Sequence, residues 1–242
     1  MPDFDFALEE LVTANRILAH EGVVDGFGHV TVRHPQRPDR FLMSRARAPD
    51  CVEVEDLMEF ALDGTAIDPK GRKPYLERFI HGAVYEARPE IMSVVHNHSP
   101  STIPFGITPV RLRPLMHMCA TIGHEVPVWD IRDRFGDTSL LVTDMEMGRD
   151  LAKALGPRPT ALMRGHGCVV AAESLRKCVW VSIYLELNAN LQMKAMAMGE
   201  VKFLSPGEVD AVMARTSGFT LDRAWEYWCR RAGRPAHRLE IN

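Results

Sequence analysis

Residues 93–99, Ser-Val-Val-His-Asn-His-Ser, decide the fold that the sequence predicts. The β-branched residues ahead of Ser99 and Pro100 predict a strand that ends at this point. Residues i and i+2 of a strand face the same side, so His96 and His98 present two imidazoles within reach of one metal ion. The H-x-H pattern is equally compatible with two surface histidines at a strand end.

A third histidine lies in a second distinctive motif, Arg164-Gly165-His166-Gly167. Glycine on both sides allows the backbone to bend and to direct one imidazole at a fixed point. Three neutral imidazoles with an open fourth position are typical of a catalytic, zinc-like site rather than a closed structural one. The alternative is a turn histidine that only makes hydrogen bonds.

Glu77 opens a segment, residues 76–88, whose apolar spacing predicts a helix leading into the histidine strand. Its carboxylate is a candidate metal ligand or acid/base catalyst. The alternative is a glutamate favoured at a helix N-terminus by the helix dipole. His81 lies one turn further on and is expected to pack beside the site rather than to bind a metal.

The composition excludes several classes of protein. The 242 residues include 29 Lys and Arg and 32 Asp and Glu, a net charge of −3, so neither nucleic acid nor an anionic membrane is an expected partner. No apolar run approaches the roughly 18 residues of a membrane span, and the acidic residues 1–12 predict no signal peptide. Five scattered cysteines outside any C-x-x-C pair indicate reduced thiols and a cytoplasmic protein.

Helical and strand patterns alternate along the chain, which predicts one α/β domain with a mixed sheet, residues 1–242, and a helical extension from about residue 205. Ser174 predicts the start of a long helix over 175–198, and Thr143 with Glu146 predicts a capping box for another. The remaining expected elements are a helix over 7–20, strands over 29–33, 40–45, 126–131 and 160–171, and one or two short helices over 206–232.

Together, Glu77, the segment Pro-Glu-Ile-Met-Ser-Val-Val-His-Asn-His (89–98) and Arg-Gly-His-Gly (164–167) resemble the class II aldolase/adducin-like family over about residues 7–200. The resemblance implies an α/β/α fold with a mostly antiparallel central sheet, assembled as a homotetramer with active sites between subunits. It also implies one divalent metal ion per subunit, held by His96, His98 and His166. The matching glutamate, Glu77, is a ligand or the acid/base catalyst in that family.

The sequence departs from the sugar-phosphate aldolases of the family. Those enzymes bind a phosphate with hydroxyl residues before the glutamate and an N-x-S turn, whereas here Pro74-Tyr75-Leu76 precede Glu77 and the early turn is Gly26–Thr31. A leucine and a tyrosine leave a phosphate too few hydrogen-bond donors. The substrate is therefore expected to be unphosphorylated.

Other segments resemble the decarboxylase branch, which acts on carboxylated muconic semialdehydes and on 3-hydroxy-2-methylpyridine-4,5-dicarboxylate. These segments are residues 114–118, 126–133, 136–138, 161–167 and 222–228. The resemblance implies a metal-dependent carboxy-lyase of aromatic-ring catabolism, acting on a hydroxy-aromatic or oxo/hydroxy-dienoic carboxylate. Zn²⁺ or Mn²⁺ is the expected metal, with Co²⁺ or Fe²⁺ compatible with the same imidazoles.

Five further residues are candidates for contact with the substrate. Arg45 and Arg47 have the guanidinium geometry for a second carboxylate, although a solvated pair at a strand end is equally compatible. The other candidates are Ser44, His29 and His117. For the two histidines, which lie in turn-like segments, ordinary hydrogen bonding within a loop is the alternative.

Three other functions remain open at this stage. These are an aldolase or epimerase for an unphosphorylated hydroxy-carbonyl compound, a scaffold like the adducin head domain, and an Fe(II) oxygenase. The three histidines argue against the scaffold, because a protein of that kind has no need of metal ligands.

Overall fold

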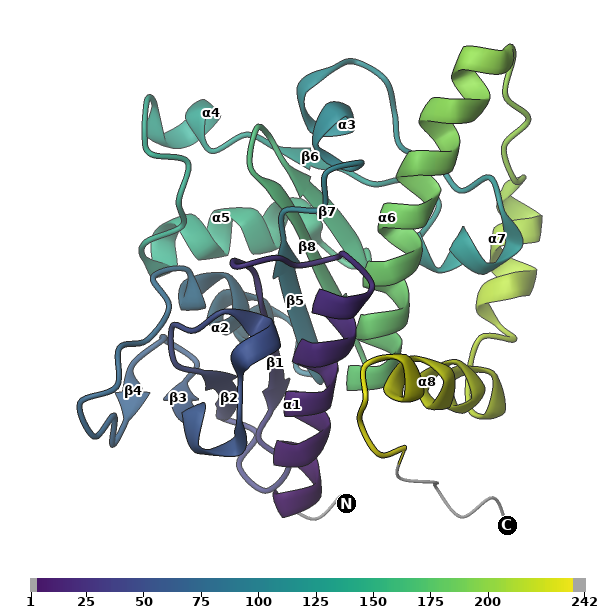
Figure 1. The fold of residues 1–242 in the computed structure, drawn as a ribbon. Helices are drawn as coiled ribbons and strands as arrows, with labels where there is room; N and C mark the ends of the chain where they lie inside the picture. Colours follow the sequence, from purple (N-terminus) through teal and green to yellow (C-terminus); the bar gives the residue numbers. More distant parts are fainter. Residues whose placement is uncertain (1–3, 237–242) are drawn as a thin grey trace.

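The computed structural model describes residues 4–236, and within them eight strands form a single sheet (Figure 1). The strands are β1 (His29–Arg33), β2 (Arg40–Ser44), β3 (Leu57–Ala61), β4 (Ala66–Ile67), β5 (Ser93–Asn97), β6 (Val128–Trp129), β7 (Thr160–Met163) and β8 (Gly167–Ala172). Their order across the sheet is β4-β3-β2-β1-β5-β8-β7-β6. Every neighbouring pair is antiparallel except β6 and β7, which are parallel. The prediction of a mixed, mostly antiparallel sheet is confirmed.

Helices cover both faces of this sheet. They are α1 (Phe4–His20), α2 (Arg78–Ala87), α3 (Ile103–Ile107), α4 (Arg132–Phe135), α5 (Met145–Leu155), α6 (Leu175–Met198), α7 (Pro206–Met213) and α8 (Phe219–Arg231). Three short 3-10 helices, Pro49–Cys51, Val54–Asp56 and His117–Ile122, complete the described elements.

The strand period separates two hydrophobic cores. Successive strand residues point to opposite faces, so Val95 and Val170 pack with α1 and α6, whereas Val94 and Val169 pack with α2 and α5. Figure 1 shows these helix pairs on either side of the sheet. The sheet is thus the middle layer, with one hydrophobic core on each of its faces.

The local signals in the sequence act as predicted at one helix start and differently at two other places. Ser174 caps α6, because its hydroxyl accepts a hydrogen bond from the Lys177 amide. The predicted capping box at Thr143 is wrong, since Asp144 occupies the cap of α5 and accepts from the Met147 amide. The predicted strand over 126–131 is also shorter than expected, because only Val128 and Trp129 pair with β7.

Two helices follow residue 205. Ser205 and Glu208 form a reciprocal capping box at the start of α7, and Trp225 and Trp228 of α8 join the core beside α1 and α6. The end of the predicted polar tail, residues 237–242, lies outside the described residues. Across residues 4–236, each helix is too short or too polar to span a membrane.

Candidate active site

The end of β5 lies at the centre of the sheet, and this position brings its histidines to the site. β5 pairs with β1 on one side, where His96 is opposite His29, and with β8 on the other, where Asn97 is opposite Cys168. His98 follows directly after the strand. The strand period therefore directs His96 and His98 to one side, and their Nε2 atoms lie 3.2 Å apart.

Two glycines allow His166 to join them. Gly165 has a φ of +65° in the turn between β7 and β8, a conformation that favours glycine. Gly167 begins β8 so close to β5 that a Cβ there would lie 2.1 Å from the Asn97 carbonyl oxygen. The ring of His166 consequently lies 4.9 Å from that of His96 and stacks 5.0 Å from that of His98, measured between centroids.

Glu77 completes the cluster from the start of α2. It occupies the cap position of this helix, yet its side chain makes no capping hydrogen bond. Its Oε1 instead accepts from the Val142 amide at 3.0 Å, and its Oε2 lies 3.5 Å from the Nε2 atoms of both His96 and His166. The carboxylate thus faces the histidines and not the helix N-terminus.

These four residues fit a divalent metal ion. Their ligand atoms all lie within 4.8 Å of one another, and two nitrogens bound tetrahedrally to one Zn²⁺ are about 3.3 Å apart. The Nδ1 of His96 lies 3.0 Å from the Cys168 carbonyl oxygen. A proton on Nδ1 donates to this oxygen and leaves Nε2 free for a metal, an arrangement typical of metal-binding histidines.

The surroundings of His96, His98 and Glu77 favour the protonation states that a metal requires of them. Desolvation lowers the pKa of His96 to about 3, and desolvation and His166 lower the pKa of His98. Burial alone would raise the pKa of Glu77, but the hydrogen bond with His166, the nearby imidazoles and the Val142 amide lower it to about 2. Neutral imidazoles at His96 and His98 and an ionised carboxylate at Glu77 are therefore the expected forms at neutral pH.

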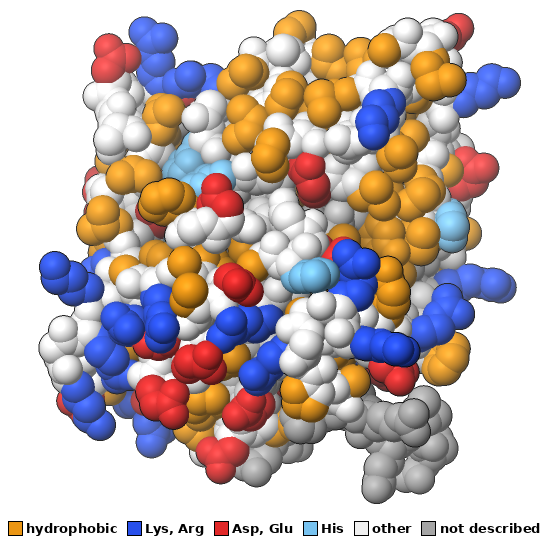
Figure 2. Space-filling view, in the orientation of Figure 1, with side chains coloured by type: hydrophobic (Ala, Val, Ile, Leu, Met, Phe, Trp, Pro, Cys, Tyr) orange, Lys and Arg blue, Asp and Glu red, His pale blue; other side chains and the backbone are white. Residues whose placement is uncertain are grey.

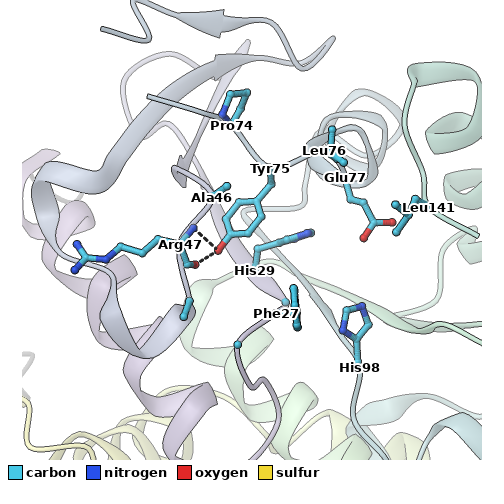
Figure 3. Close-up of a pocket in the computed structure, with 13 residues that line it drawn as sticks. Phe27, His29, Ala46, Arg47, Pro74, Tyr75, Leu76, Glu77, His98 and Leu141 are labelled. Carbon is cyan, nitrogen blue, oxygen red and sulfur yellow. Dashed lines mark hydrogen bonds between the residues drawn. The ribbon is translucent and has the colours of Figure 1, made fainter. Parts of the chain in front are cut away.

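A cavity of about 460 Å³ opens beside the cluster (Figure 3). Apart from Glu77, His29 and His98, its wall is mostly apolar. The hydroxyl of Tyr75 is hydrogen-bonded to the backbone amide and carbonyl of Arg47. The Tyr75 ring therefore contributes its apolar surface to the cavity wall, and its hydroxyl is already engaged. The lining residues are Gly26, Phe27, Gly28, His29, Ala46, Arg47, Ala48, Pro74, Tyr75, Leu76, Glu77, His98 and Leu141.

A buried hydrogen-bond chain runs from this cavity into the core. The Nδ1 of His29 lies 2.7 Å from the Nε2 of His81, whose Nδ1 lies 2.8 Å from the Thr31 hydroxyl. Thr31 in turn lies 2.8 Å from the hydroxyl of Tyr85. Burial lowers the pKa of both His29 and His81, so this chain holds two neutral rings and leaves the Nε2 of His29 available to a ligand. The expectation that His81 packs beside the site is in keeping with this position.

Arg45 and Arg47, the two arginines predicted to bind the substrate, both pair with Asp56. Arg45 Nε and Arg47 Nη1 each lie 2.5 Å from a different oxygen of Asp56, whose pKa they lower against the opposing effect of burial. Figure 3 shows the Arg47 side chain extending away from Glu77 and His98. A carboxylate of the chain itself pairs with both guanidinium groups, and their binding of a substrate carboxylate stays a prediction.

Ser44 and His117 lie outside the cavity wall. Ser44 is buried in β2 opposite Leu57 and is close enough to hydrogen-bond with Tyr75. His117 is exposed at the start of a 3-10 helix and lines a different cavity. Of the five candidates for substrate contact, only His29 brings its side-chain polar group to the histidine cluster.

Some residues of the site had no signal in the sequence. Leu141 and Val142 come from the loop before α5, and neither belongs to a motif that predicts contact with Glu77. The Thr31–Tyr85 contact joins residues 54 positions apart. Only the pairing of β1 with β5 and the packing of α2 bring such residues together.

This mixed sheet between helices, with a His₃Glu cluster beside its central strand, is the arrangement of a class II aldolase-type protein. Residues 9–193 match the family model of the Class II Aldolase and Adducin N-terminal domain, and the chain belongs to this family. The family expected from the sequence is confirmed.

Its relatives include several decarboxylases. The chain is 32% identical to "Decarboxylase tropJ" of Talaromyces stipitatus, over 90% of this chain and 91% of that protein. It is 27% identical to "3,4-dihydroxyphthalate decarboxylase" of Arthrobacter keyseri, over 91% and 92% of the two chains. A crystal structure of an aldolase II superfamily protein from Pseudomonas syringae shares the fold, with a TM-score of 0.80 and 22% identity over 96% of this chain and 94% of that one.

Proposed function

We propose that this protein is a metal-dependent decarboxylase of a hydroxy-aromatic or oxo/hydroxy-dienoic carboxylate. The observation that supports this most strongly is the convergence of Glu77, His96, His98 and His166 beside a largely apolar cavity. The decarboxylases among its relatives support the choice of reaction over aldol cleavage. Within the proposal, His96, His98 and His166 hold Zn²⁺ or Mn²⁺, and Glu77 is either a fourth ligand or a catalytic group.

A bound divalent ion would supply Lewis-acid stabilisation of the negative charge that develops on a substrate oxygen as CO₂ leaves. The chain supplies the rest. Its ionised Glu77 accepts hydrogen bonds and can orient a water molecule, but with a pKa of about 2 it is a poor proton donor at neutral pH. His29 offers its Nε2 to the substrate from the cavity wall and is held there by His81.

The cavity wall supports a flat, unphosphorylated substrate. Tyr75 and Phe27 present ring surfaces, and Leu76 is 62% exposed directly before Glu77. A phosphate in this position would meet the leucine side chain and a tyrosine hydroxyl already hydrogen-bonded to Arg47. An aromatic ring or conjugated diene buries apolar surface against the same wall.

The test is a substrate screen for CO₂ release. Purified protein is stripped with EDTA, reloaded with Zn²⁺ or Mn²⁺, and offered 3,4-dihydroxyphthalate, other hydroxybenzoates and 2-oxo or 2-hydroxy dienoates. We expect CO₂ from at least one of them, dependent on metal and lost in His96→Ala. Release of an aldehyde instead would favour the aldolase, and turnover that consumes O₂ would favour an oxygenase.

We further infer a homotetramer acting in the cytoplasm. The family resemblance and the scattered thiols support this part of the proposal; four of the five cysteines are buried. Light scattering of the purified protein tests the assembly, and a mass of one or two chains would contradict it.

A further inference from the structure

The buried hydrogen-bond chain that ends at His29 determines what this residue can offer to a ligand. It links the Tyr85 hydroxyl, the Thr31 hydroxyl, the His81 ring and the His29 ring in that order. All four side chains are buried, and His29 lines the cavity beside the histidine cluster. Buried polar groups require hydrogen-bond partners, so the position of each proton follows from these contacts.

The order of the protons is set at the inner end of the hydrogen-bond chain, at the Val94 carbonyl. A carbonyl oxygen can only accept. The Thr31 hydroxyl lies 3.4 Å from this oxygen, and the His81 ring also makes a hydrogen bond with the Val94 backbone. Both groups therefore donate toward Val94, so Thr31 directs its one proton there and the Nδ1 of His81 carries a proton.

The remaining contacts fit the same order. The Thr31 oxygen has two lone pairs, which accept from the Nδ1 of His81 and from the Tyr85 hydroxyl, each 2.8 Å away. A neutral imidazole with a proton on Nδ1 has none on Nε2, so the Nε2 of His81 accepts from the Nδ1 of His29 at 2.7 Å. The opposite order would turn an unprotonated Nδ1 of His81 toward the Val94 carbonyl, and two acceptors would then face each other.

This order leaves the Nε2 of His29 unprotonated at a mostly apolar wall. The Tyr75 hydroxyl in the same wall is already hydrogen-bonded to Arg47. Figure 2 shows a histidine surface beside hydrophobic side chains in the upper left of its view, the combination of side chains that lines the cavity. An acceptor left unpaired under a bound ligand costs free energy, so a ligand that fits here has to supply a donor.

We propose that His29 selects a ligand with a hydroxyl group, whose hydrogen bond it accepts at Nε2. His81 is the positioning residue, because it holds the His29 ring in the tautomer with an unprotonated Nε2. The proposal rests on the proposed function, since it concerns the substrate of the same cavity. It adds that the chain itself recognises a hydroxyl, so that an analogue without this group leaves His29 unpaired and binds more weakly.

Nitrogen-15 NMR of the full chain after EDTA treatment tests the tautomer without any ligand. Long-range proton–nitrogen correlation spectra distinguish protonated from unprotonated ring nitrogens, and the His29 signals are identified by their loss in His29→Gln. We expect a protonated Nδ1 and an unprotonated Nε2 in the wild type. His81→Leu removes the acceptor and is expected to mix the two tautomers, whereas His81→Gln, whose amide oxygen can accept, is expected to preserve the wild-type one.

Isothermal titration calorimetry on the same EDTA-treated protein tests the ligand preference. The probes are meta- and para-hydroxybenzoate and the matching fluorobenzoates, which keep the ring and the carboxylate but have no hydroxyl proton. We expect at least one hydroxybenzoate to bind about tenfold more tightly than its fluoro analogue, or 1.4 kcal/mol. This preference is expected to vanish in His29→Phe and to return in part in His29→Gln.

Arg230→Gln is the control for these measurements, because Arg230 is an exposed arginine of α8 outside the cavity wall. It is expected to keep the wild-type preference.

Three results would overturn the proposal. They are a protonated Nε2 of His29 in the wild type, equal affinity or no binding for both pairs of probes, and a preference for the hydroxybenzoate that persists in folded His29→Phe. None of these measurements uses a metal or CO₂ release, so this proposal and the proposed decarboxylase can fail separately.

Discussion

Replacing Gly167 by alanine tests how the strands hold the candidate ligands. Gly167 directly follows His166, and its α-carbon faces the carbonyl of Asn97, which lies between His96 and His98. A Cβ at this position would lie 2.1 Å from the Asn97 carbonyl oxygen, and real Cβ contacts are essentially never shorter than 3.0 Å. The two strands must therefore separate by at least 0.9 Å, the difference between these distances.

This shift occurs inside the candidate metal site. A misplacement of about 1 Å can reduce a catalytic rate about 100-fold, and a disturbed environment of metal ligands reduces metal affinity about 10- to 100-fold. We therefore expect Gly167→Ala to bind Zn²⁺ at least tenfold more weakly than the wild type. A destabilisation of about 1–3 kcal/mol is expected from the same crowding.

Chelator competition measures the Zn²⁺ affinity without any assumption about substrate. Gly106→Ala is the matched control, because a Cβ at Gly106 would come no closer than 3.5 Å to its nearest neighbour, the Met163 carbonyl oxygen. This control is expected to keep wild-type affinity. Unchanged affinity in Gly167→Ala would refute the idea that the β5–β8 contact positions His166.

Three further predictions concern protonation, substrate contact and the arginine pair. Burial lowers the pKa of His96 and His81 to about 3, whereas the unfolded value is about 6.5. The metal-free protein therefore loses stability as the pH falls from about 6.5 towards 3. The loss is up to about 1.4 kcal/mol per pH unit for each of the two residues. Urea denaturation at pH 7, 6 and 5 measures this, and a rising midpoint would contradict it. Leu76 is a 62% exposed residue of the cavity wall. Leu76→Ser is therefore expected to raise KM about tenfold with little change in thermal stability. An unchanged KM would show that Leu76 does not contact the substrate. Arg47→Gln is expected to alter KM less than twofold in steady-state assays, because Asp56 already binds this guanidinium. A tenfold rise in KM would instead support the predicted contact of Arg47 with the substrate.

Predictions that depend on neighbouring residues were the more successful ones. The alternation around His96 and His98 and the cap at Ser174 each depend on residues within four positions, where backbone geometry dictates the outcome. The prediction of the α5 cap was wrong, and the reason is also local. Thr143 and Asp144 are adjacent and both can cap a helix, and the pattern does not distinguish them, whereas in the folded chain Asp144 bonds the Met147 amide.

Long-range contacts explain the main differences at the site. Arg45 and Arg47 look available in the sequence because no acid lies beside them, but Asp56, nine residues beyond Arg47, binds both in the folded chain. His117 is a candidate in the sequence only because it is a polar residue in a turn-like segment, and the fold places it in a different cavity. The fold class followed from alternating patterns, whereas the partners of each charged group required the packing of distant elements.

Metal content tests the central claim most directly. Protein dialysed against Zn²⁺ or Mn²⁺ and then against metal-free buffer should retain about one ion per chain, measured by inductively coupled plasma mass spectrometry. His96→Ala and His166→Ala should each retain less than about a tenth of that amount, since each loses a ligand of the cluster, while Arg230→Gln should match the wild type. Equal metal content in the wild type and both histidine variants would contradict the assignment of the site.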